Sequence, residues 1–221
     1  MKHLARFASI AIVAITCSCA TDEYETGDND FSYLKAEMAM VTTADAKTLR
    51  HAVTDSGDSL VFAPPLACSW ANTADSTYRA MLYYSSEGDR SSIQGISAHQ
   101  VLVLRIPQGK PENAKTDPLT IESAWIDKQR RFLNLGLYVM TGKSGDADSR
   151  QSVGVVCDTV KAATGSAPAY NITLVHNQNG VPENYSARVF ASIPISGMEP
   201  GDTIRLQANT YDGTVTRCFV K

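Results

Sequence analysis

The chain has 221 residues, of which 43% are hydrophobic and 19% are charged, and its formal net charge is -3 at pH 7. This length fits one large or two small domains of about 100–200 residues each. A slightly acidic chain lacks the basic footprint of nucleic-acid-binding proteins, so we expect no nucleic-acid partner.

The chain begins with a predicted lipoprotein signal peptide, residues 1–18. Lys2, His3 and Arg6 supply a positive start, and Phe7–Ile15 is an apolar run. This run fits a signal core of about 7–15 residues. It is far shorter than the roughly 20 consecutive apolar residues that span a bilayer. We therefore expect export from the cytoplasm without a transmembrane helix.

Two cysteines at the end of the apolar run compete as the lipidation site. Cys17 follows Thr16, whereas Cys19 follows the smaller Ser18. A small residue suits the signal peptidase, so we expect Cys19 to become the acylated N-terminus, with Cys17 as the alternative. Acyl chains contribute about 0.8 kcal/mol per buried methylene to membrane binding. The acidic segment 19–33 then forms a solvated tether, and the expected location is the outer membrane, on its periplasmic or surface side.

Residues 34–107 carry short apolar runs separated by turn residues, which predicts β-strands. The expected strands are Leu34–Val41, Thr48–Val53, Ser59–Phe62, Thr77–Ser85 and Val101–Ile106. Five or so strands over about 70 residues fit a small closed barrel of the OB type.

Aromatic residues lie in or beside the strands of this predicted barrel. OB-type barrels often bind oligosaccharides or other extended ligands on one sheet face. Trp70, Tyr78, Tyr83 and Tyr84 are the candidates for such a ligand face. Large aromatics in small β-domains mostly fill the core, however, and we favour that position for these rings over the ligand face.

A polar, proline-containing segment, residues 108–118, is the predicted linker to a second domain at 119–221. Alternation places Leu133, Leu135 and Leu137 on one strand face and Ile204, Leu206 and Ala208 on another. Asp212-Gly213 favours a hairpin turn before the last strand. Six to seven short strands with this spacing predict an Ig-like β-sandwich. The expected fold class is all-β, with an OB-type barrel followed by this sandwich.

Three cysteines follow the signal peptide: Cys68, Cys157 and Cys218. We expect these thiols to be buried as small hydrophobic groups. The alternative is a single disulfide, because three thiols allow at most one, and Cys157–Cys218 is the pair that lies within one predicted domain. The spacing matches no zinc pattern. We expect no metal and no cofactor.

The sequence offers little for catalysis. His51, His99 and His176 are the histidines beyond the signal peptide, and no Gly-x-Ser-x-Gly nucleophile motif is near them. His176 follows Ile172 and Leu174 at alternate positions, so we expect it on the same strand face, at the end of the core. Glu122 lies close to Trp125, a ring expected to fill the sandwich core. We expect no enzymatic activity.

Several segments together resemble the NigD-like lipoproteins. The resemblance is carried by an acylated cysteine with an acidic leader, and by Asp55–Leu60, Tyr78–Tyr84, Asp117–Ile126 and Phe132–Leu135. It implies an N-terminal OB-type domain, a C-terminal β-sandwich and no established catalytic site. It also implies a role in bacteriocin immunity as an alternative. The sequence-based expectation is a monomeric envelope lipoprotein that binds the membrane through acyl chains and a glycan or protein partner through its folded domains.

Overall fold

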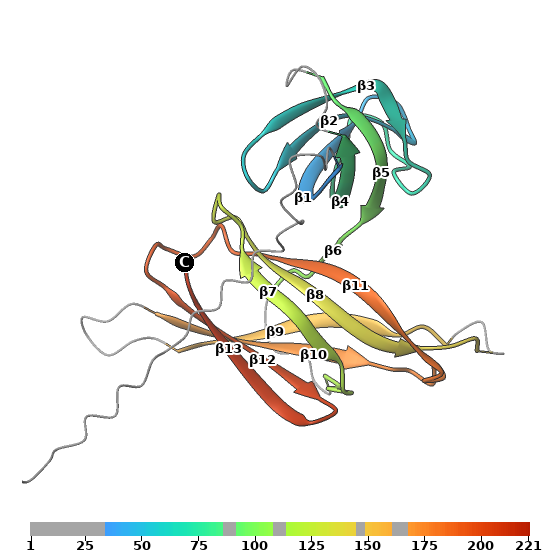
Figure 1. Ribbon diagram of the computed structural model, residues 1–221. Helices are drawn as coiled ribbons and strands as arrows, with labels where there is room; N and C mark the ends of the chain where they lie inside the picture. The colour runs from blue at the N-terminus through green and yellow to red at the C-terminus, as the bar shows by residue number, and fades with distance from the viewer. Residues whose placement is uncertain (1–33, 86–91, 108–113, 145–148, 161–167) are drawn as a thin grey trace, which may run out of the picture.

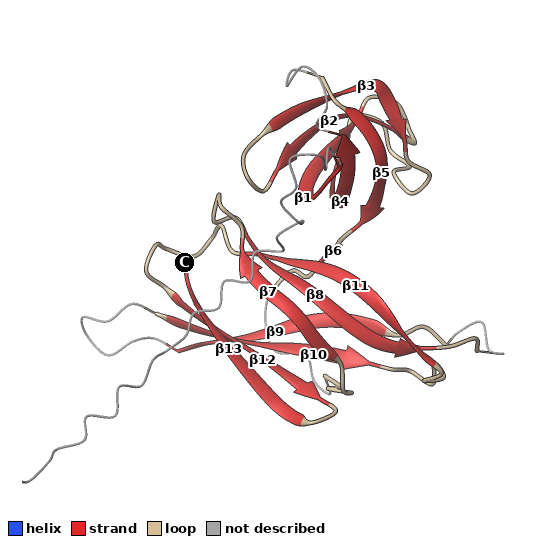
Figure 2. Ribbon diagram, viewed as in Figure 1, coloured by secondary structure: helices blue, strands red, loops and turns tan. Residues whose placement is uncertain are grey.

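The computed structural model describes residues 34–85, 92–107, 114–144, 149–160 and 168–221. Every regular element in these ranges is a β-strand, which confirms the predicted all-β class (Figure 2). None of the described residues belongs to a helix of the length and hydropathy that a membrane crossing requires. The predicted signal peptide and tether, including Cys17 and Cys19, lie outside the described residues.

The N-terminal domain is one five-stranded sheet with the strand order β3-β2-β1-β4-β5. Its strands are β1 (Leu34–Thr43), β2 (Thr48–Thr54), β3 (Ser59–Ala67), β4 (Thr77–Ser85) and β5 (Gln94–Gln100). The sheet curls until β3 meets the start of β5 (Figure 1), where Phe62 and Ile93 form a parallel bridge. The amide of Ile93 donates to the carbonyl of Val61 at 2.9 Å. This curled sheet is the expected OB-type barrel.

The barrel interior is filled by one face of each strand. Its core consists of Ala39, Val41, Leu49, Ala52, Leu60, Phe62, Cys68, Ala71, Ala80, Leu82, Tyr84 and Ile93. Strand β4 is apolar on both faces because one face lines this core and the other meets the second domain.

The second domain is a β-sandwich of two four-stranded sheets, β6-β11-β8-β7 and β13-β12-β10-β9. Its strands are β6 (Leu102–Val103), β7 (Thr120–Ile126), β8 (Phe132–Thr141), β9 (Ser152–Val160), β10 (Ala169–Asn177), β11 (Tyr185–Pro194), β12 (Thr203–Thr210) and β13 (Gly213–Val220). Two of the strand pairs, β10–β12 and β6–β11, are parallel. The predicted alternating residues of β8 and β12 are buried between the sheets.

The chain enters the sandwich earlier than predicted. Residues 101–106 were expected to form the last barrel strand, but Leu102 and Val103 pair with β11. The amide of Leu104 donates to the carbonyl oxygen of Ser192 at 2.9 Å, and the Leu104 side chain joins the sandwich core. The boundary between barrel and sandwich therefore lies near Val101, a few residues before the predicted end of the barrel at residue 107.

Trp125 lies outside the sandwich core, contrary to the sequence prediction. A β-bulge in β7 shifts its register between Ile121 and Ser123. Ile121 is buried in the core, and after the bulge it is Ala124 and Ile126 that pack against the core. The extra residue reverses the alternation, so that Trp125 faces the barrel instead.

Apolar side chains from both domains meet at the junction between barrel and sandwich. Met38, Met81 and Val101 are buried there, and Ala36, Tyr83, Trp125 and Phe190 pack against them. The barrel stands on the outer face of the sheet that contains β11, β8 and β7 (Figure 1). This contact positions the polar groups described next.

Candidate functional site

The Arg79 side chain lies at the centre of the domain junction and is hydrogen-bonded to residues of both domains. Arg79 lies on β4 between Tyr78 and Ala80, on the face turned away from the barrel core. Only 2% of its surface is exposed. A buried guanidinium is costly unless it is paired and hydrogen-bonded, so its partners determine whether the junction is stable.

The negative partner of Arg79 is Asp55, from the turn between β2 and β3. Nη1 of Arg79 donates to Oδ1 of Asp55 at 2.6 Å, and Nη2 donates to Oδ2 at 2.5 Å. Such a two-point Arg–carboxylate contact is both strong and directional. The barrel therefore supplies the charge that neutralises its own buried arginine.

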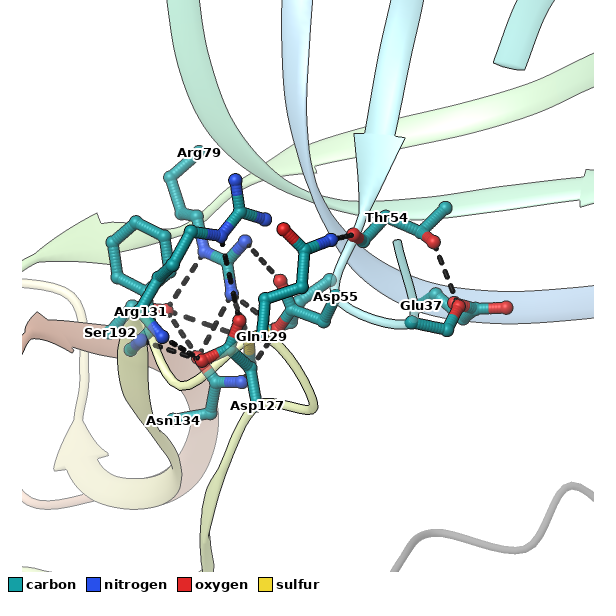
Figure 3. A network of polar contacts seen from close by, with 12 residues as sticks. Glu37, Thr54, Asp55, Arg79, Asp127, Gln129, Arg131, Asn134 and Ser192 are labelled. Carbon is teal, nitrogen blue, oxygen red and sulfur yellow. Dashed lines mark hydrogen bonds and ion pairs between the residues drawn. The ribbon is translucent and has the colours of Figure 1, made fainter. Parts of the chain in front are cut away.

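Within the barrel, Nη2 of Arg79 also lies 3.8 Å from Sδ of Met38, and three further partners come from the sandwich (Figure 3). Nε donates to Oγ of Ser192 at 3.1 Å, and Nη2 donates to Oδ1 of Asn134 at 3.0 Å. Nδ2 of Asn134 donates to Asp55 at 2.7 Å, which closes the network. The guanidinium also lies 4.2 Å from the ring centroid of Phe132. One side chain thus joins β4 of the barrel to β8 and β11 of the sandwich.

A second polar contact across the junction comes from the turn between β7 and β8. Nε2 of Gln129 donates to the carbonyl oxygen of Thr54 at 3.1 Å. The turn is held by Asp127, whose Oδ1 accepts the amides of Arg131 at 2.5 Å and Phe132 at 2.7 Å. Burial raises the pKa of Asp127, and the negative charge of Asp55 adds to this, whereas the two backbone amides and Arg131 act in the opposite direction.

Beside the junction, the outer face of the sandwich sheet carries a group of side chains that we call the open face. It consists of Glu122, Tyr138, Arg188 and Phe190, arranged around Gly136. Nη2 of Arg188 lies 2.6 Å from Oε2 of Glu122, and each of these side chains is about one-third exposed. The hydroxyl of Tyr138 donates to Oε1 of Glu122 at 3.2 Å. The Arg188 guanidinium lies 4.7 Å from the ring centroid of Phe190.

The bulge in β7 and the absence of a side chain at Gly136 create the open face. A Cβ atom at Gly136 would lie 2.6 Å from Oγ of Ser123 and 3.0 Å from Oε2 of Glu122. The side chains of Glu122 and Ser123, which are consecutive residues of β7, therefore lie on the same face of the sheet. In a regular strand, consecutive side chains point to opposite faces. Glycine at 136 leaves the room that they occupy.

The four aromatic candidates for a ligand face lie in three different environments. Trp70 and Tyr78 pack edge to face, with ring centroids 5.6 Å apart, and Nε1 of Trp70 donates to the carbonyl of Ala98 at 2.9 Å. Tyr84 is buried in the barrel core, where burial and then the charge of Glu37 raise its pKa. Tyr83 lies at the domain junction. Adjacent strand residues face opposite ways, so Tyr83 and Tyr84 do not share a ligand face.

The histidines lie apart from one another, and His176 has the core position expected for it. Its Nδ1 lies 3.1 Å from the carbonyl of Pro118, and its Nε2 lies 3.1 Å from Oε1 of Gln151. His51 and His99 are exposed on the barrel. No group of three or more His, Cys, Asp or Glu side chains suited to a metal ion occurs within the described residues.

The alternative Cys157–Cys218 disulfide does not form in this fold. Cys157 lies on β9 and Cys218 on β13, the two outermost strands of a four-stranded sheet. Three strand spacings separate them by about 14 Å, whereas the Cα atoms of a disulfide lie about 4.4–6.8 Å apart. The register also places them on opposite faces, since Cys157 pairs with buried Ile172 and Cys218 pairs with exposed Arg205. Cys68 is buried, which raises its pKa.

The sequence prediction missed the role of Arg79. Arginine next to tyrosine in a predicted strand looks like an exposed residue, and Ser192 is 113 positions away in the chain. The one available signal was the apolar character of both faces of β4, which requires a second layer outside the barrel.

A family model described as the NigD-like C-terminal beta sandwich domain matches residues 103–221. This range begins within β6, so it agrees with the structural start of the sandwich. A comparison with functionally curated proteins finds no relative of significant sequence similarity.

Several solved structures share the fold of both domains. A NigD-like immunity protein from Bacteroides caccae is 21% identical, with a TM-score of 0.64 over 84% of this chain and 96% of that one. A protein from Parabacteroides distasonis, provisionally described as toxin-related, is 16% identical, with a TM-score of 0.62 over 85% and 93% of the two chains. A Bacteroides fragilis protein, provisionally described as a lipoprotein, is 14% identical, with a TM-score of 0.54 over 84% and 96%. The TM-scores show a common fold. The family match, which covers more than half of the sequence, shows that this chain belongs to the NigD-like family.

Proposed function

We propose that this protein is an envelope-anchored lipoprotein whose two domains act as one non-enzymatic binding or structural module. The observation that carries the proposal is the Arg79 network, which fixes barrel and sandwich relative to each other through Asp55, Asn134 and Ser192. A fixed pair of domains suits a module that presents a preformed surface, because binding then costs little ordering entropy.

The N-terminal sequence supports the anchoring. A short apolar run ends at Cys17 and Cys19, and the first described strand begins at Leu34. Even fully extended, the segment 19–33 spans at most about 50 Å. The folded domains would therefore stay close to the membrane that holds the acyl chains. The lipoprotein description of the Bacteroides fragilis structure agrees with this placement.

The use of the polar side chains supports a role without catalysis. His176 is hydrogen-bonded within the sandwich, Arg79 and Asp55 neutralise each other, and Asp127 holds a turn. A nucleophile–histidine–carboxylate arrangement needs side chains that are free to meet a substrate. These residues have structural partners instead.

Metabolic labelling with palmitate tests the anchoring. We expect the label on the wild-type protein, loss of label and of membrane sedimentation in Cys19→Ala, and retention of both in Cys218→Ala, the matched control at an exposed cysteine. Label that is lost only in Cys17→Ala would move the anchor to that residue. Absence of label from the wild type, with sedimentation unchanged in the double variant Cys17→Ala/Cys19→Ala, would refute the proposal.

Bacteriocin immunity is the second candidate function, favoured by the description of the Bacteroides caccae structure as an immunity protein. If it applies, deletion of the gene should sensitise the producing strain to a bacteriocin encoded beside it, and the wild-type copy should restore resistance. Equal survival of deleted and complemented strains would exclude this function.

A further inference from the structure

We propose that the open face, formed by Glu122, Tyr138, Arg188 and Phe190 around Gly136, binds a neutral, hydroxyl-rich saccharide. The inference rests on the proposed function and deepens it, because it assigns the binding surface and the chemical class of the ligand.

The polar centre of the open face offers hydrogen-bond acceptors. Oε2 of Glu122 accepts from Nε of Arg188 at 2.8 Å and lies 2.6 Å from Nη2, and Oε1 accepts from the Tyr138 hydroxyl. A carboxylate has about four lone-pair sites and a hydroxyl oxygen has two, so Glu122 and Tyr138 both keep acceptor capacity for a ligand. Neighbouring sugar hydroxyls, each of which donates and accepts, match this arrangement.

The net charge of the open face selects against a charged ligand. Glu122 and Arg188 neutralise each other, and a carboxylate or ammonium ligand would have to compete with the 2.6 Å contact between them. A neutral polar ligand can bind while the pair stays intact.

The aromatic rings supply the apolar part of the site. Tyr138 and Phe190 are half-buried on neighbouring strands β8 and β11, and the Arg188 guanidinium covers part of the Phe190 ring. The apolar surface continues to the domain junction through Phe190 and Trp125. Rigid rings beside polar groups are typical of sites that bind small polar ligands. The C–H face of a sugar ring fits such a surface.

Stability alone does not account for the construction of the open face. An exposed ion pair such as Glu122–Arg188 contributes only about 0–1 kcal/mol. Yet β7 breaks its register at Glu122, and β8 carries glycine at 136, to place this pair over the sheet. Bulges of this kind are over-represented next to functional sites, where they redirect a side chain.

A saccharide fits the open face better than a protein partner does. Protein interfaces have an apolar core of large side chains. The large hydrophobic residues that are most exposed among the described residues are Leu34, Ile96, Leu102, Val103, Tyr185, Tyr211, Val215 and Val220. None of them belongs to the open face.

Affinity electrophoresis of the acylated full-length protein in detergent tests the inference. The gels contain glucan, mannan or galactan, with anionic alginate as the charged comparison. We expect at least one neutral polysaccharide to retard the protein. Glu122→Gln and Tyr138→Ala should each weaken that retardation about tenfold, as expected for losing one polar or one aromatic contact.

Two matched variants control for surface changes away from the site. Arg205→Ala and Tyr211→Ala replace exposed residues on β12 and in the β12–β13 turn, and both should bind as the wild type does. Urea unfolding of each variant shows whether a binding loss reflects loss of the fold.

Three results would overturn the inference: no retardation in any neutral gel, equal retardation of wild type and both site variants, or stronger retardation by alginate. Palmitate labelling separates this outcome from failure of the proposed function. A labelled, sedimenting protein without polysaccharide binding would refute the saccharide site alone, whereas an unlabelled protein would refute the anchoring.

Discussion

At the residue scale, the buried Arg79 and the exposed Arg188 make a direct comparison. Both pair with a carboxylate, but the Arg79 side chain has no solvent exposure and that of Arg188 is about one-third exposed. Removing one partner of a buried pair costs about 3–5 kcal/mol, because the other charge is left uncompensated. Exposed pairs contribute about 0–1 kcal/mol.

We therefore expect Arg79→Met to lower the free energy of unfolding by about 3–5 kcal/mol, and Arg188→Met to lower it by less than about 1 kcal/mol. Urea titration followed by circular dichroism measures both values. Equal, small losses in the two variants would show that the junction does not depend on Arg79.

Asp127 gives a prediction about pH. Burial raises its pKa, so the folded protein holds this proton to a higher pH than the unfolded chain does. The stability contributed by the protonated form is therefore complete below the unfolded-state pKa and is lost as pH rises through the folded-state pKa.

Asp127→Asn removes this titration and keeps the Oδ1 acceptor for the amides of Arg131 and Phe132. We expect the variant to be more stable than the wild type at neutral pH. The difference between their free energies of unfolding should become smaller at acid pH, where Asp127 of the wild type is protonated. Urea unfolding across that range provides the measurement. A variant that is less stable than the wild type at neutral pH, with the gap closing in acid, would reverse the assigned direction.

At the element scale, closure of the barrel depends on a close approach between β5 and β3. A Cβ atom at Gly95 of β5 would lie 2.9 Å from the ring of Phe62 and 3.0 Å from the side chain of Leu66. Phe62 is buried in the barrel core, so its ring has little room to move. Overpacking of this kind costs about 1–3 kcal/mol.

Gly95→Ala should therefore destabilise the protein by about 1–3 kcal/mol. Gly197→Ala is the matched control, because a Cβ at Gly197 would meet no atom within 4 Å. Thermal unfolding of the two variants gives the comparison. If both variants melt with the wild type, β3 and β5 are not packed as closely as described.

The strands also show what a sequence can and cannot predict. Leu133, Leu135 and Leu137 are fully buried, as their alternation predicts, because regular pairing preserves parity along a strand. Trp125 was misplaced because the bulge at Glu122 adds one residue and reverses that parity. Neither alternation nor composition reveals a bulge.

The junction was equally hidden from sequence reasoning. Residues 101–106 are apolar except for Arg105, a pattern that fits a strand in either domain, and only the pairing with β11 assigns this segment to the sandwich. Arg79, Asn134 and Ser192 come from distant parts of the chain, and each alone resembles a surface residue. Their burial follows from the docking of two domains, which no local pattern encodes.

At the scale of the whole molecule, the central claim is that barrel and sandwich form a single body. The Arg79 network, the Gln129–Thr54 hydrogen bond and the apolar cluster around Met38 and Met81 all cross the junction. Domains joined by buried contacts of both kinds should unfold together, whereas loosely tethered domains unfold independently.

The two tryptophans of the chain report on this claim most directly. Trp70 lies in the barrel and Trp125 on the sandwich side of the junction. In Trp125→Phe the fluorescence follows the barrel, and in Trp70→Phe it follows the sandwich. We predict that, within each variant, urea unfolding gives a single transition whose midpoint is the same by fluorescence and by circular dichroism. A fluorescence midpoint that departs from the circular dichroism midpoint in either variant, or two resolved transitions, would contradict the single body.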